Sequence, residues 1–265
     1  MQDLWPQTYF GYGFKKTKLS YFIIDNFVKF IYRRCDKILF SSEGFKPKIK
    51  SYIKHDSLFW IPNWSIIDIE SKFTNRINFP GEFNFTFAGN VGKVQNLSFI
   101  IKAFKNIENK HKRVHLNIIG DGSDLENIKS LSKSLKLKNI NFFGRVSLTK
   151  IRKYLLSSDV LIISLKDHEG FNETIPGKFQ VYLSCCKPIF SVFNGVISNY
   201  VNKHELGFSA NPNLLDEIEN GFKNFLNLKK TDYDKISNNS KKLSESKFSK
   251  SKIIKKINKI HWSYL

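Results

Sequence analysis

The chain has 265 residues, 41% of them hydrophobic and 15% aromatic, which is enough to build the cores of two domains, or of one large domain with an appendage. Its 43 Lys and Arg outnumber 23 Asp and Glu and give a formal net charge of +20, so the sequence favours anionic partners such as nucleotide phosphates or an acidic membrane surface. The basic residues are dispersed and accompany no zinc-finger, RNP-type or GXXG signature, so we expect no nucleic-acid partner.

Three cysteines, Cys35, Cys185 and Cys186, are too few for a disulfide framework and match no metal-site spacing, as is typical of a reducing compartment. No apolar run approaches the roughly 20 residues that span a bilayer, because Asp25 and Lys29 interrupt the best candidate. The first residues do not resemble a signal peptide. We therefore expect a cytoplasmic protein, and peripheral binding to the cytosolic face of the inner membrane stays open.

Residues 1–75 contain a helical pattern, a strand segment KILFS, a second helix expected to start near Glu43, and a strand end in SLFWIPNW. One and a half βα units are too few to enclose a core of their own, and domains seldom have fewer than about 50 residues. We therefore expect residues 1–75 to be the C-terminal remnant of an α/β domain followed by a linker. On this interpretation the chain is a fragment, or one half of a split protein.

Residues 76–230 alternate short apolar runs with amphipathic helical patterns. Strands are expected at FNFTFAG, VHLNIIG, INFFG, DVLIISL, PIFSVF and GFSA. Helices are expected at LSFIIKAFKNI, DLENIKSLSKSL, LTKIRKYLLSS, from Pro176 onwards and over 195–203. Strands that are mostly apolar and alternate with helices are typical of a parallel sheet covered on both faces. The sequence therefore predicts a doubly wound, Rossmann-like α/β domain.

Residues 231–265 form a basic helical segment. Its apolar positions make one stripe, which consists of Ile253, Ile254, Ile257, Ile260 and Tyr264. Two interpretations stay open: the stripe packs back on the N-terminal part, or it lies on an anionic membrane. The one D-x-D pattern, 232–234, lies among lysines at a helix start, so we interpret it as a helix cap and expect no metal site.

Ligands of open parallel sheets bind beyond the carboxyl ends of the strands, and the unusual residues of this chain gather there. The loops that follow four of the expected strands are AGNVGKVQN, GDGSD, GRVS and KDHEGFNETIPGK. In the first loop, Gly89 and Gly92 would let the backbone approach a ligand, and Lys93 adds a positive charge beside a helix N-terminus. The loop matches neither a P-loop nor a dinucleotide fingerprint. Together the four loops indicate a binding edge.

The segment 174–190 carries the strongest signal. Pro176 suits a helix start, and the helix would direct Phe179, Tyr182 and Leu183 inward. Glu173 and Lys178 bracket its N-terminus, where a carboxylate could accept hydrogen bonds from sugar hydroxyls and a lysine could offset the charge of a leaving diphosphate. The alternative is that Glu173 only interacts with the helix dipole and that Lys178 is a solvated helix residue.

These motifs resemble those of glycosyltransferase family 4, the retaining enzymes of GT-B fold that include bacterial O-antigen and capsule transferases. The matching segments, in chain order, are DLWPQTY (3–9), LFSSEGF (39–45), IPNW (61–64), AGNVGK (88–93), GDG (120–122), FFGRV (142–146) and the residues Thr174, Pro176, Lys178, Tyr182, Leu183, Lys187, Pro188 and Ile189. The resemblance covers nearly the whole chain but only the C-terminal two-thirds of the family's length. It implies that residues 1–75 end an acceptor-binding domain, that 76–230 bind the donor, and that the helices of 231–265 pack back toward the N-terminal part.

The resemblance implies a metal-independent transfer, without a cofactor, from a nucleotide diphosphate sugar to a saccharide or lipid-linked acceptor in surface polysaccharide synthesis. Its catalytic group would be Glu173, which orients the sugar, and Lys178 and Lys93, which neutralise the diphosphate. Donor contacts would come from Gly89, Asn90, Gly92, Gly120, Asp121, Gly122, Gly144, Arg145, Val146, Thr174, Pro176 and Gln180. The family's ribose-binding Glu falls at Val181, with Gln180 beside it as the substitute. By position, His168 is the one candidate for the family's catalytic-region histidine.

Other functions stay open on the sequence alone. The chain could be a non-catalytic donor-binding remnant, or one subunit of a split transferase whose partner chain supplies the missing N-terminal half. A nucleotide-sugar epimerase shares the two-domain architecture and would change the sugar with no acceptor present. A nucleic-acid-binding protein would show binding that falls steeply with salt.

Overall fold

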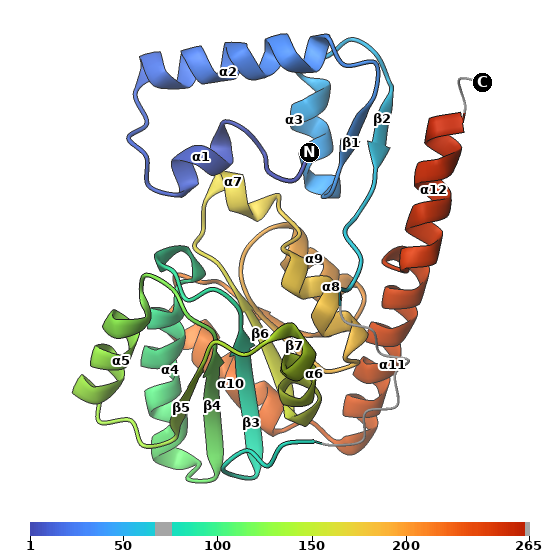
Figure 1. Cartoon of the computed structure of the whole chain (residues 1–265). Helices are drawn as coiled ribbons and strands as arrows, with labels where there is room; N and C mark the ends of the chain where they lie inside the picture. Colours follow the sequence, from blue (N-terminus) through green and yellow to red (C-terminus); the bar gives the residue numbers. More distant parts are fainter. Residues whose placement is uncertain (67–75, 263–265) are drawn as a thin grey trace.

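The computed structural model describes residues 1–66 and 76–262, and its secondary structure follows the hydrophobic pattern of the sequence closely (Figure 1). The N-terminal part consists of α1 (Gln7–Gly11), α2 (Lys18–Arg33), β1 (Ile38–Phe40), η1 (Glu43–Phe45), α3 (Lys46–Lys50) and β2 (Leu58–Trp60). The helix expected near Glu43 starts there as a single 3₁₀ turn and continues as α3.

The larger part is built on six parallel strands in the order β5-β4-β3-β6-β7-β8. The strands are β3 (Phe83–Ala88), β4 (Val114–Ile119), β5 (Ile140–Gly144), β6 (Val160–Ser164), β7 (Ile189–Val192) and β8 (Gly207–Ala210). All six occupy segments that the sequence assigns to strands. The chain leaves the centre at β3, reaches one edge at β5 and returns to β6 on the other side of β3. This reversal defines a doubly wound sheet, and the predicted fold class is confirmed.

Helices cover both faces of this sheet. They are η2 (Lys93–Gln95), α4 (Leu97–Lys110), α5 (Leu125–Ser134), α6 (Leu148–Ser157), α7 (Glu169–Asn172), α8 (Gly177–Ser184), α9 (Val196–Lys203) and α10 (Leu215–Leu226). Side chains of α4, α5 and α10 form one core with Phe85 and Phe87 of β3. Side chains of α6, α8 and α9 form the other core against Leu161 and Ile163 of β6. Because strand residues alternate between two apolar cores, the strands are mostly apolar, although β3 and β4 also contain the buried polar residues Asn84, Thr86 and Asn117.

The N-terminal part has its own small core, in which β1 pairs with β2 in parallel and Phe45 and Ile49 are fully buried. It contacts the larger part through α1, which packs on α7 (Figure 1). Thr8 Oγ1 donates a hydrogen bond of 3.2 Å to the carbonyl oxygen of Gly170. A Cβ at Gly170 would lie 2.5 Å from backbone atoms of residues 7 and 8, so the two segments meet backbone to backbone.

Two helices, α11 (Lys230–Lys247) and α12 (Lys250–Trp262), carry the chain back toward β2 (Figure 1). The predicted stripe is partly buried, since Ile253 and Ile260 are less than a tenth exposed while Ile254 is 39% exposed. Lys256 Nζ donates a hydrogen bond of 2.7 Å to the carbonyl oxygen of Trp60. The stripe therefore packs on the protein, and Tyr264 lies outside the described residues. None of the described helices is long and apolar enough to cross a membrane.

Candidate donor-binding site

The loops that follow β3 and β4 lie against each other at the carboxyl edge of the sheet. Gly89 N–H donates to the carbonyl oxygen of Ile119 (2.9 Å), and Val91 N–H donates to that of Asp121 (2.9 Å). Gly120 has a φ of +139°, and a Cβ there would lie 1.8 Å from the carbonyl oxygen of Gly89. Only glycine allows this approach. The two glycine-rich motifs therefore form one continuous backbone surface.

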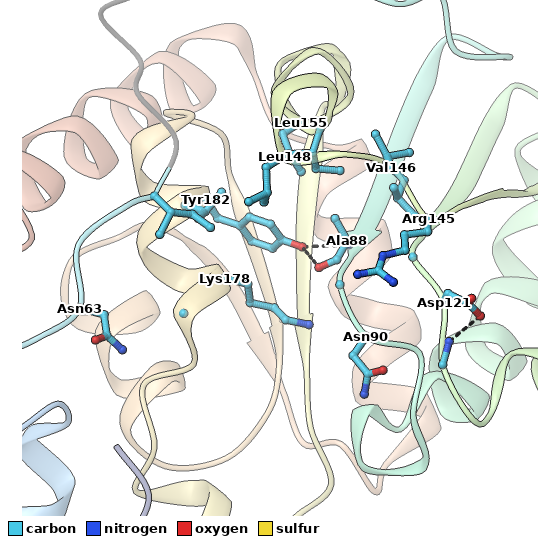
Figure 2. Close-up of a pocket in the computed structure, with 18 of the residues that line it drawn as sticks. Asn63, Ala88, Asn90, Asp121, Arg145, Val146, Leu148, Leu155, Lys178 and Tyr182 are labelled. Carbon is cyan, nitrogen blue, oxygen red and sulfur yellow. Dashed lines mark hydrogen bonds between the residues drawn. The ribbon is translucent and has the colours of Figure 1, made fainter. Parts of the chain in front are cut away.

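This surface forms one wall of a cavity of about 990 Å³ (Figure 2). Eight predicted donor-site residues line it: Gly89, Asn90, Gly120, Asp121, Gly122, Arg145, Val146 and Lys178. The other lining residues are Asn63, Trp64, Ile66, Ala88, Ile119, Leu148, Ile151, Leu155, Gly177, Val181 and Tyr182. The structure therefore brings together loops from four strands, as expected from the sheet-edge argument. The size of the cavity suits a ligand of nucleotide dimensions.

Lys178 is the most unusual group in this cavity. It lies in the first turn of α8 and its Nζ is buried, 4.0 Å from the centre of the Phe87 ring, with no hydrogen-bond partner among the described residues. Burial lowers the pKa of Lys178 to about 7. The alternative that Lys178 is a solvated helix residue is wrong. A buried, unpaired amine beside a helix N-terminus is suited to bind an anionic group, because the anion would supply the missing partner.

Tyr182 fixes the position of α8 relative to the sheet. Its hydroxyl donates to the carbonyl oxygen of Ala88 (3.2 Å) and accepts from the N–H of Ala88 (3.0 Å), as Figure 2 shows. The sequence indicates that Tyr182 faces inward, but not that it bonds both backbone groups at the end of β3. These bonds hold the first turn of α8, and with it Lys178, beside the glycine-rich loops.

Two residues of the predicted catalytic group lie outside the lining of the cavity. Lys93 is exposed on η2. Glu173 lines a smaller hollow of about 390 Å³ against the N-terminal part, with Leu4, Gly44, Pro47, Lys48 and Ser51. Burial raises the pKa of Glu173. The structure thus separates Glu173 from the cavity lining, although it stands only five residues before Lys178.

Three of the other predicted residues lie in α8 or in the loop before it, outside the cavity lining. Gln180 is buried, with its amide 3.1 and 3.0 Å from the carbonyl oxygens of Pro176 and Gly177, while Val181 lines the cavity. Pro176 is the N-cap of α8, and Thr174 Oγ1 donates to the carbonyl oxygen of Gly170 (3.0 Å). The described part of the cavity wall therefore carries an apolar side chain at the position of the expected ribose carboxylate.

Three other predicted positions also lie outside the cavity lining. His168 Nδ1 accepts from the N–H of Gly170 (3.1 Å) and caps α7. Gly92 N–H donates to Gln95 Oε1 (2.9 Å), and the carbonyl oxygen of Gly144 accepts from the N–H of Gly120 (2.8 Å). These contacts hold the loops in place from outside the cavity. They place no further polar side chain in the cavity.

The described residues contain no group of three or more His, Cys, Asp or Glu side chains that could hold a metal ion. The D-x-D pattern lies where the sequence suggests a helix start, with Asp232 in the first turn of α11. Among the described cavity-lining residues, the charged side chains are those of Asp121, Arg145 and Lys178. The Asp121 carboxylate, whose Oδ1 accepts the N–H of Gly122 (2.7 Å), would repel an anion, so the two cationic side chains are the groups available to one.

A doubly wound sheet with a nucleotide-sized cavity at its carboxyl edge, preceded by part of a second α/β unit, is the architecture of GT-B glycosyltransferases. The family model of the glycosyl transferases group 1 matches residues 68–243, so the chain belongs to this family. It is 26% identical over 237 residues to the probable glycosyltransferase WbjE of Pseudomonas aeruginosa, covering 82% of this chain and 58% of that protein.

Two further similarities agree with this assignment. An uncharacterised glycosyltransferase of Methanocaldococcus jannaschii is 26% identical over 262 residues, which cover 92% of this chain and 63% of that protein. The crystal structure of HepE from Anabaena in complex with UDP matches all of this chain and 71% of HepE, with a TM-score of 0.77 and 14% identity. The chain thus spans about three fifths of the length of the two glycosyltransferases from Pseudomonas aeruginosa and Methanocaldococcus jannaschii.

Proposed function

We propose that this chain binds a nucleotide diphosphate sugar in the 990 Å³ cavity and transfers the sugar to an acceptor saccharide. The observation that carries the proposal is the buried Nζ of Lys178 at the N-terminus of α8, opposite the glycine-rich loops, which has no hydrogen-bond partner among the described residues. Family membership supports it. So do the structures of HepE with UDP-glucose and with UDP and glucose, since they show which ligands a similar fold binds.

In this proposal the diphosphate lies against the backbone of Gly89 and Gly120 and the first turn of α8. The ammonium of Lys178 and the guanidinium of Arg145 balance its charge in place of a metal ion. Lys93, which is exposed, contributes only at longer range. The base would lie near Val146, where the lining of the cavity is largely apolar.

The reaction we propose breaks the bond between the anomeric carbon and the diphosphate oxygen, and the nucleoside diphosphate leaves with the bonding electrons. The acceptor hydroxyl oxygen forms the new bond on the same face of the sugar, so the configuration is retained. Its proton passes to the leaving diphosphate. Lys178 stabilises the negative charge that develops on that leaving group.

The acceptor we propose is a lipid-linked saccharide of surface polysaccharide synthesis, which would place the protein in the cytoplasm at the membrane. The net charge of +20 supports a location beside an anionic surface. The acceptor side is incomplete in the described residues, because the N-terminal part has only the two strands β1 and β2. A second polypeptide segment that completes this α/β unit is therefore part of the proposal.

A second candidate is a protein that binds the donor without turnover, and the separation of Glu173 from the cavity lining favours it. One experiment distinguishes the two. A panel of nucleotide diphosphate sugars is screened by thermal shift with a chelator present, and the sugar that stabilises most is then incubated with and without saccharide acceptors. Release of nucleoside diphosphate only with an acceptor supports a transferase, and stabilisation without release supports a binding protein. Conversion of the sugar with no acceptor would indicate an epimerase, and no stabilisation by any sugar would overturn the proposal.

A further inference from the structure

Helix α2 has its apolar face on the outside of the molecule. Val28 is buried, and it packs with Ile24 and Tyr32 on the small N-terminal core. The opposite face exposes six large apolar side chains, which are 41 to 67% accessible: Leu19, Phe22, Ile23, Phe27, Phe30 and Ile31. Their spacing of three and four residues places them on one side of the helix. A surface helix of a globular protein normally shows the reverse arrangement.

Exposed aromatic side chains also occur in the segment that precedes α2. Trp5, Tyr12 and Phe14 are 42 to 60% exposed. The ring of Tyr9 stacks on both Trp5 (5.5 Å between centres) and Phe14 (4.1 Å), so these side chains form one patch. Figure 1 shows α2 at one end of the molecule, far from the six-stranded sheet. We call the outward face of α2, formed by its six exposed apolar side chains, the α2 surface. The Trp and Tyr side chains of residues 5–14 are of the kind found at a boundary between water and lipid.

The charges around the α2 surface are mostly positive. The basic residues of this segment are Lys15, Lys16, Lys18, Lys29, Arg33 and Arg34. The acidic residue within the helix, Asp25, is buried on the inner face, where Lys29 Nζ lies 2.7 Å from its carboxylate and the Tyr52 hydroxyl donates to it. The guanidinium of Arg34 lies 3.7 Å from the centre of the exposed Phe30 ring. An apolar face with cations at its borders is complementary to an anionic lipid surface.

Further strands beside β1 would not cover the outward face. A helix packs on a sheet by one face, and α2 already uses the Val28 face for the sheet side. Residue Met1 lies along the edge of β1, because its amino group donates to Leu39 O (2.6 Å) and Ser41 N–H donates to Met1 O (3.1 Å). Strands added at this edge would continue the sheet beneath the inner face of α2. Added strands alone would therefore leave the outward face uncovered.

We propose that the α2 surface binds an anionic lipid bilayer, with α2 lying flat in the plane of the headgroups. The apolar side chains enter the boundary between headgroups and acyl chains, and Lys15, Lys18 and Arg34 contact the lipid phosphates. This inference rests on the α2 surface alone, so it holds whether or not the donor site is catalytic. If the acceptor is lipid-linked, the same contact brings the acceptor to the protein.

The test is flotation of the full chain with vesicles of phosphatidylethanolamine and phosphatidylglycerol, compared with vesicles of phosphatidylcholine. The double variant Phe22→Ser/Phe27→Ser should reduce binding to the anionic vesicles at least about tenfold, since two aromatic side chains lose their burial in lipid. The variant Lys15→Gln/Lys18→Gln should weaken binding by about fivefold for each lysine, and this difference should vanish at high salt. The matched control Leu214→Ser/Ile254→Ser changes two exposed apolar side chains elsewhere and should bind like the parent protein.

Each outcome decides the proposal. Because all substituted side chains are exposed, circular dichroism and the melting temperature without vesicles should match the parent. Equal flotation of parent and Phe22→Ser/Phe27→Ser, or no flotation of the parent, would overturn the inference. A photo-crosslinker at position 27 provides the second readout in cells: crosslinks to lipid support the proposal. Crosslinks to a second copy of the chain, or to another polypeptide that covers α2, would refute it.

Discussion

Replacement of Lys178 by Met separates a structural role from a ligand-binding role. Met has a similar length and no charge, so it removes the cost of burying an ammonium group. The pKa of Lys178 falls from 10.5 to about 7. At 1.36 kcal/mol per pKa unit this difference corresponds to a destabilisation of up to about 5 kcal/mol below pH 7. Loss of the contact with the Phe87 ring offsets part of the gain. We therefore expect Lys178→Met to unfold at higher denaturant concentration than the parent protein.

The sign of the pH dependence follows from the same linkage. The unfolded chain binds the Lys178 proton more tightly than the folded protein, so the stability of the parent rises with pH between about 7 and 10.5. The advantage of Lys178→Met should thus be complete below pH 7 and disappear toward pH 10.5. Urea unfolding across this range measures it, with Lys133→Met on the surface of α5 as the control. The donor sugar should bind the variant 10- to 100-fold more weakly, because one charge-assisted hydrogen bond is lost. A variant that is less stable and still binds the donor would refute the assignment.

Three further predictions concern the same cavity. The affinity for the donor should be highest below pH 7 and should fall by up to about tenfold per pH unit above it, because a bound diphosphate favours protonated Lys178. Calorimetric titration across the pH range measures this affinity. Gly120→Ala should lower the free energy of unfolding by about 2 kcal/mol or more, because the added Cβ would clash with the carbonyl oxygen of Gly89. In the control Gly177→Ala the added Cβ meets no atom within 4 Å, so the free energy of unfolding should change little. Val181→Glu should improve binding of a ribonucleoside diphosphate relative to its 2′-deoxy form, because a carboxylate on the cavity wall can accept from the 2′-hydroxyl; unchanged relative affinities would contradict the ribose position.

The sheet could be predicted from the sequence because each strand is an apolar run followed by a glycine or polar loop. Strand β3 and the loop after it illustrate this: the phenylalanines of FNFTFA alternate with Asn, Thr and Ala, which gives one strongly apolar face, and a glycine follows the last residue. The assembly of four loops into one site also follows, since parallel strands bring their carboxyl ends to one edge. The apolar pattern of the strands and the parallel topology were therefore enough to predict the fold and eight of the residues that line the cavity.

Side-chain direction could not be predicted at the loop before α8. Glu173 and Lys178 are close in sequence, yet Glu173 faces a hollow at the N-terminal part and Lys178 enters the cavity. Glu173 is the C-cap of the short helix α7, whose four residues have no hydrophobic repeat long enough to recognise from the sequence. The exposed face of α2 escaped detection for a related reason. Periodicity reveals that a helix has an apolar side, but not whether that side meets the core.

The backbone contact at Gly170 ties residues that are about 160 positions apart in the chain. Since a Cβ there would lie 2.5 Å from backbone atoms of residues 7 and 8, no side chain can relieve the contact by changing its rotamer. An exchange of the segment before α8 with that of a relative, made to alter sugar preference, would therefore succeed only if position 170 remains glycine or if α1 is exchanged with it. Without a glycine at position 170, the segment before α8 and helix α1 can be exchanged only together, although they belong to different parts of the fold.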